Sequence, residues 1–166
     1  MGAQALLNSL VRYKASANGD LLDALAGLDG APAAEYGAAL RVLHHAHIVD
    51  RIFLAHLQRT GHAYDKSWSA ETPPLDRLAA DIRETDRWYV DHVARLRPDE
   101  LDEVIDFSFT DGARGRMSRE EMVAHVVTHA GYHRGEVGRL LPEIGERASR
   151  DVFAGYLHRS DPARRA

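Results

Sequence analysis

The chain has 166 residues, contains no cysteine and carries a formal net charge of -4 at pH 7. Without cysteine it can form no disulfide and offers no thiolate metal ligand and no cysteine nucleophile. The acidic balance and the lack of a basic stripe argue against a nucleic-acid partner. No apolar run approaches the ~20 residues that span a bilayer, and the first ten residues do not resemble a signal peptide. We therefore expect one soluble cytoplasmic domain over residues 1–166 without a membrane partner.

Hydrophobic spacing predicts two long helices in the first part of the chain. The first covers residues 4–28, where Gly19 and its polar neighbours could introduce a kink. The Gly- and Pro-containing segment 29–32 is a clear stop signal. The second helix covers residues 33–59, with an apolar face formed mainly by small and β-branched side chains.

The middle of the chain predicts a loop and a third helix. The loop covers residues 60–73, and packing is a better explanation of its Tyr64 and Trp68 than contact with a substrate. The third helix covers residues 74–96 and ends before an Arg-Pro pair. Its Trp88 and Tyr89 are expected in the core, and a single helical turn is expected over 98–103.

The last part of the chain predicts a short extended segment, a fourth long helix and a short final one. Residues 104–110 favour an extended conformation, but we expect this segment to be too brief to found a sheet. Ser118 and Glu121 form a capping box at the start of a helix that runs to Leu141 and is followed by Gly145. A short helix over 150–158 and a loose tail complete the chain.

This order of elements predicts an all-α four-helix bundle with a long connection before the fourth helix and a short C-terminal helix. In such bundles, metal sites are built from inward side chains on facing helices.

The fourth helix carries histidines where core residues belong. At about 100° per residue, His129 and His133 fall within an apolar stripe, and His125 lies near its edge. The stripe consists of Met122, Val126, Val137 and Leu140. Burying two imidazoles costs free energy unless their nitrogens are satisfied, and histidines four residues apart can share one metal ion. The alternative is that each ring bonds to a carbonyl or carboxylate.

The second helix contains four histidines, of which one faces the same interior. His45 lies near the centre of the apolar face. His44 and His47 are expected at solvated or boundary positions, and His56 at a polar end of the apolar stripe. The second and fourth helices thus each place histidine on an inward face.

Two segments, LHHAHIVDRIFLAHL and HVVTHAGYHRGEV, resemble the DinB family of bacterial metal-binding four-helix bundles. In the first, His45 stands five residues ahead of an Asp-Arg pair; the second has three histidines at four-residue spacing, followed by Arg-Gly. The resemblance implies a divalent metal, zinc or nickel, bound by His45, His129 and His133. Glu136 stands where the family often has Gln, and we favour a surface charge over a partner for His133.

The resemblance also implies a reaction class. Three neutral imidazoles leave open metal positions, as in catalytic sites, and characterised relatives in the wider superfamily transfer or isomerise with small thiols. We therefore expect a metal-dependent enzyme that transfers a low-molecular-weight thiol to a small electrophile. The alternatives are a metal-dependent hydrolase and a non-catalytic metal-binding or stress-related dimer. Tyr132 or Arg134 could orient the substrate.

Two further expectations concern the surroundings of the metal and the assembly. Each ligand ring should donate its free N–H to an acceptor, for which Glu136, Glu121 and Asp50 are the candidates. By analogy with the family we also expect a homodimer.

Overall fold

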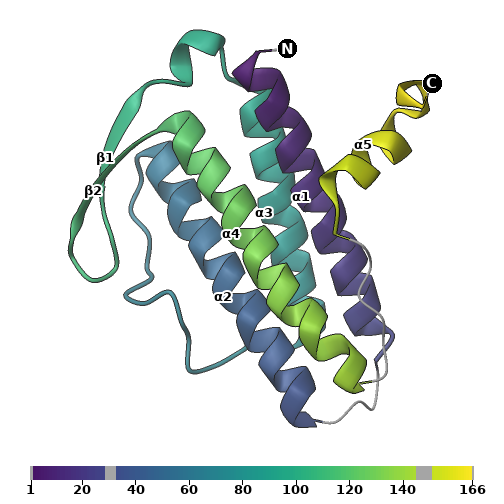
Figure 1. Cartoon of the computed structure of the whole chain (residues 1–166). Coiled ribbons are helices and arrows are strands. Elements are labelled where there is room, and N and C mark those ends of the chain that lie inside the picture. Colours follow the sequence, from purple (N-terminus) through teal and green to yellow (C-terminus); the bar gives the residue numbers. More distant parts are fainter. Residues whose placement is uncertain (1, 29–32, 145–150, 166) are drawn as a thin grey trace.

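The computed structural model describes residues 2–28, 33–144 and 151–165. Its four long helices are α1 (Ala3–Ala26), α2 (Ala33–Gln58), α3 (Leu75–Arg95) and α4 (Arg119–Leu140). They run alongside one another as a bundle (Figure 1) in which α1 packs on α3 and α4, and α2 packs on α4. The predicted all-α bundle is confirmed, and each helix starts and ends within two residues of its predicted boundary.

The interior of the bundle is apolar at both ends and polar in the middle. One buried apolar group contains Tyr89 and Met122, and the other contains Leu25 and Leu78. On every long helix, buried polar residues lie between the two groups or at the border of one of them. These are Lys14 and Asn18 on α1, His45, His47 and Asp50 on α2, Thr85 and Asp86 on α3, and His133 and Arg134 on α4. We call these residues, together with the half-buried His129 of α4, the central polar layer.

A β-hairpin precedes α4. Strand β1 (Val104–Ser108) pairs antiparallel with β2 (Arg114–Ser118), so that Phe107 lies opposite Gly115. The prediction that the extended segment is too brief for a sheet was therefore wrong: β1 buries alternate residues, and a turn with Gly112 at φ 86° returns the chain beside it. In Figure 1 the hairpin stands beside one end of α2 and α4.

Local signals explain the helix ends. The Ser118 side chain accepts a hydrogen bond from the Glu121 backbone N–H, while the Glu121 carboxylate accepts one from the Ser118 N–H, which confirms the capping box. Helix α1 runs through Gly19 without a break. A 3-10 turn, Pro98–Glu100, marks the predicted helical turn after α3.

The C-terminal part contains helix α5 (Phe153–Ser160) and a 3-10 turn, Pro162–Arg164, in the tail that was expected to be loose. The predicted stop at 29–32, the glycine at 145 and the predicted start of the last helix at 150 lie outside the described residues. Within the described ranges, every helix is too short or too polar to cross a bilayer.

Candidate metal centre

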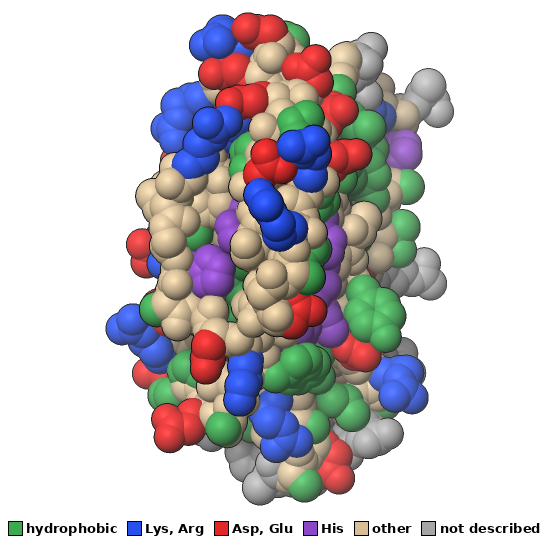
Figure 2. Space-filling model, turned by 90° about the vertical axis from the view of Figure 1, so that its left-hand side faces the viewer, with side chains coloured by type: hydrophobic (Ala, Val, Ile, Leu, Met, Phe, Trp, Pro, Cys, Tyr) green, Lys and Arg blue, Asp and Glu red, His purple; other side chains and the backbone are tan. Residues whose placement is uncertain are grey.

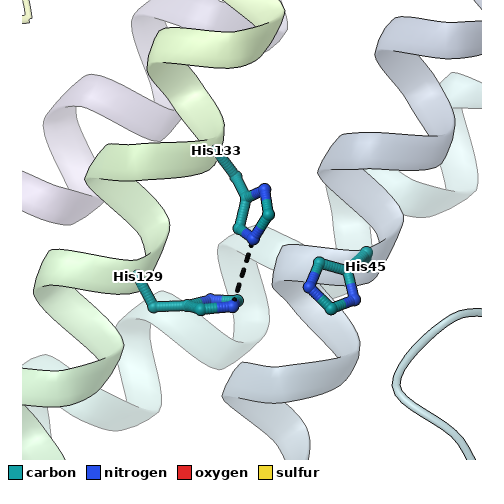
Figure 3. A group of neighbouring side chains, drawn as sticks. All are labelled: His45, His129 and His133. Atoms are coloured by element: carbon teal, nitrogen blue, oxygen red, sulfur yellow. Dashed lines mark hydrogen bonds between the residues drawn. The ribbon is translucent and has the colours of Figure 1, made fainter.

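Three histidines from two helices meet in the central polar layer. His45 of α2 and His129 and His133 of α4 point toward one another (Figure 3), and each offers a ring nitrogen within 4.8 Å of the others. The His129 and His133 Nε2 atoms are 3.1 Å apart. The two α4 rings converge because they stand one helical turn apart, and the packing of α2 against α4 brings the third ring to them. This cluster can hold a metal ion.

Two of the rings are oriented by acceptors behind them. His133 Nδ1 lies 2.6 Å from Glu136 Oε2, and His45 Nδ1 lies 2.8 Å from the Ser67 carbonyl oxygen. With Nδ1–H donated to these acceptors, each ring presents its Nε2 lone pair to the shared centre. The interpretation of Glu136 as a surface charge was therefore wrong. Ser67 was missed, because a backbone carbonyl in a loop leaves no signal in the sequence.

The third ring has a nitrogen without a partner. His129 Nδ1 is buried and makes no hydrogen bond to any described residue. Burial, together with the neighbouring imidazoles, lowers the pKa of His129 to about 3. Burial also lowers the pKa of His45, against a raising effect of the Ser67 carbonyl. Both rings are therefore neutral near pH 7, which is the form that binds metal. Three imidazole nitrogens suit zinc or nickel better than calcium or magnesium.

Two aromatic side chains flank the cluster. The Trp68 ring stacks on His45 with centroids 4.0 Å apart and planes 5° apart. Packing was the expected role of Trp68, and the residue it packs on is one of the three histidines. Tyr132 is 67% exposed, and its ring stands edge-on to His133 at 5.1 Å. It therefore does not pack between helices and stays available at the rim of the cluster.

Arg134, the other predicted substrate-orienting residue, is directed elsewhere. Its guanidinium is buried and donates to Asp151 Oδ2 at 2.7 Å and to Asn18 Oδ1 at 3.1 Å. It thus ties α4 to α1 and to the segment before α5. These contacts give Arg134 a structural role, and a role in orienting a substrate stays a prediction.

The other two proposed acceptors for ligand N–H groups are also occupied elsewhere. Asp50 Oδ2 lies 2.6 Å from Lys14 Nζ, and Glu121 caps α4. Of the three candidates, only Glu136 contacts a histidine of the cluster.

The other histidines of α2 and α4 differ in how deeply they are buried. His44 and His56 are half-buried, as expected. His47 is only 8% exposed, so its predicted boundary position was wrong. His125 is half-buried with its ring 5.4 Å from that of His129, which fits its predicted place at the edge of the stripe.

A cavity of about 220 Å³ adjoins the cluster. It lies between α2, α4, the hairpin and the loop after α2, and its lining residues are His45, Val49, Ile52, Phe53, His56, Ser67, Phe107, Phe109, Thr110, His125 and His129. Figure 2, which faces the hairpin side of the molecule, shows histidine side chains at the surface with hydrophobic side chains next to them. The contribution of the hairpin to this cavity was not predicted.

Comparison with known proteins agrees with this architecture. The family model described as DinB family matches residues 1–162. No curated protein matches the chain. The match covers nearly the whole chain, including both histidine-bearing helices. The chain belongs to the DinB family.

Proposed function

We propose that the protein is a metal-dependent enzyme in which His45, His129 and His133 bind zinc or nickel, and that it transfers a low-molecular-weight thiol to an electrophile. The observation that carries this proposal is the convergence of three imidazoles beside a cavity, with the Nε2 atoms of His129 and His133 only 3.1 Å apart. A shared metal ion would accept the lone pairs of both nitrogens at once.

The protein's own residues orient the histidine rings and cover part of the cluster. Glu136 and the Ser67 carbonyl fix two of the rings, and Trp68 covers one face of His45. Three protein ligands leave coordination positions open. A bound divalent cation would supply the positive charge that lowers the pKa of a thiol or a water.

The reaction requires no redox chemistry. The thiol gives up its proton to solvent, its sulfur forms a bond to the electrophilic carbon, and the leaving group departs with the electron pair of the broken bond. The thiol must be a separate small molecule, since the chain contains no cysteine.

Metal analysis of untagged protein tests the ligand assignment. His129→Ala and His133→Ala are each expected to weaken zinc or nickel binding by more than about 100-fold, since loss of a ligand should cost more than loss of an outer partner. His44→Ala and His62→Ala should retain the metal. Equal metal content in all four variants would show that these histidines are not the ligands.

Activity assays separate the proposed reaction from its alternatives. Metal-loaded protein should accelerate the reaction of glutathione, bacillithiol or mycothiol with chlorodinitrobenzene or monobromobimane, and His133→Ala should abolish the acceleration. Cleavage of esters or amides without thiol transfer would identify a hydrolase. Tight metal binding without turnover in broad screens would identify a non-catalytic protein. A homodimer stays a prediction, which light scattering can test.

A further inference from the structure

We propose that the cavity beside His45 and His129 is a subsite for an uncharged, ring-sized group, and that Phe107, resting on Gly115, sets its dimensions. That this group belongs to the electrophile rests on the proposed function; the binding itself does not.

The walls of the cavity are largely apolar. Val49, Ile52 and Phe53 come from α2 and face Phe107 and Phe109 of the hairpin segment. The Phe107 ring lies 5.8 Å from Phe53 and 4.9 Å from Phe109, measured between centroids. Such a surface favours flat hydrocarbon groups, which can stack or meet the rings edge-on.

The described lining of the cavity offers no charged side chain to pair with an ionic ligand group. Among the described residues that line the cavity there is no lysine, arginine, aspartate or glutamate. In metal-free protein, a carboxylate or an ammonium group buried here would lose its hydration without gaining an opposite charge from the lining, which disfavours its binding. The cavity therefore selects an uncharged group next to the three histidines.

The volume limits the size of the group. An apolar cavity of ~150 Å³ is large enough to hold benzene, whereas drug-sized ligands occupy ~300–1,000 Å³. At about 220 Å³, the cavity has room for one substituted ring or an alkyl group of similar volume.

Gly115 fixes the position of the hairpin wall. It lies directly opposite Phe107 in the strand register, and a Cβ atom added at Gly115 would lie 2.4 Å from Phe107 Cζ. The ring therefore lies on the backbone of β2, in space that any other residue would fill with a side chain. Phe107 lines the cavity and Gly115 does not. We expect a methyl group at position 115 to push the ring into the cavity.

Titration of metal-free protein with fluorobenzene, followed by ¹⁹F NMR and by backbone amide shifts, tests the subsite. We expect saturable binding, with the largest amide shifts at residues 107–110 and along the lining part of α2. The charged analogue 4-fluorobenzoate should bind at least about tenfold more weakly. Absence of saturable binding, or equal binding of the two compounds, would overturn the proposal. Metal content is measured separately, so a failure here is distinct from a failure of the metal site.

Two variants test the role of the wall. Gly115→Ala should weaken fluorobenzene binding about tenfold or more, whereas Gly61→Ala, whose added Cβ meets no atom within 4 Å, should not. Phe107→Ala should enlarge the cavity and strengthen the binding of 1-fluoronaphthalene about tenfold relative to fluorobenzene. Thermal unfolding verifies that each variant is folded. If Gly115→Ala does not fold, the naphthalene result decides. Unchanged selectivity in folded variants would refute the role of Phe107 and Gly115.

Discussion

The central polar layer contains two clusters, one of charged side chains and one of histidines, which differ in the contacts that their polar atoms make. Toward α1 and α3, Lys14 Nζ lies 2.6 Å from Asp50 Oδ2 and 2.6 Å from Asp86 Oδ1. Toward α4, the three histidines face one another and leave His129 Nδ1 without a partner among the described residues. The first cluster pairs a cation with carboxylates, although Asp50 Oδ1 also has no hydrogen-bond partner among the described residues. The second brings three imidazoles together around one point. The convergence of several metal-binding nitrogens, and not burial alone, therefore points to a ligand.

A single helix contributes to both clusters. Asp50 follows His45 by five residues on α2, which places the two side chains about 140° apart around the helix axis. Asp50 also links α2 to α3, because its backbone carbonyl accepts a hydrogen bond from the Tyr89 hydroxyl at 2.8 Å. Asp50, the aspartate of the Asp-Arg pair in the sequence, is thus part of the ion-pair cluster around Lys14 and is not a partner of the three histidines.

Lys14→Met should have the largest effect. Lys14 is completely buried, and its removal leaves two carboxylates close together without a cation. Loss of one partner from a buried ion pair typically costs about 3–5 kcal/mol. We expect a loss of this size in the free energy of unfolding of metal-free protein at pH 7, measured with urea.

The exposed Arg12→Met on the same helix is the matched control and should change stability little. Folded Lys14→Met should still bind the metal. A loss of stability below about 1 kcal/mol would show that the carboxylates do not depend on Lys14.

His47 gives a second test, in the same layer but outside both clusters. Burial lowers the pKa of His47 to about 4 from 6.5. Between these values the unfolded chain binds a proton that the folded protein excludes, so stability is present above pH 6.5 and falls as the pH drops toward 4. We expect His47→Gln to reduce the loss between pH 7 and 4.5 by up to about 3 kcal/mol in metal-free protein. Parallel pH profiles for variant and parent would contradict the buried, neutral state of His47.

The three histidines and Lys14 also show what the sequence could and could not predict. Helical spacing identified His45, His129 and His133, because the direction of a side chain around a helix follows from residue number alone. Burial of Lys14 depends on Asp50 and Asp86 from two other helices, and the spacing within α1 contains no information on them.

The hairpin shows the same limit. Spacing predicted its first strand as an extended segment, but pairing depends on the segment that returns beside it, where Gly115 leaves room for the Phe107 ring. The cavity was missed because its wall comes from this pairing. Interactions within a helix were thus predictable, whereas those between segments required the structure.

The smallest expected effect concerns Glu136, a charged residue that contacts the histidine cluster instead of the cluster around Lys14. Its carboxylate holds His133 Nδ1 at 2.6 Å, and loss of such an outer partner typically weakens metal binding 10–100-fold. Glu136→Ala should fall in that range, as measured by competition with a chelator. Glu136→Gln keeps an acceptor oxygen and removes only the charge, so its loss should be smaller. Glu120→Ala, at the other end of α4, is the control. If the glutamine variant lost as much affinity as the alanine variant, the negative charge of Glu136, and not its hydrogen bond, would be what supports the metal.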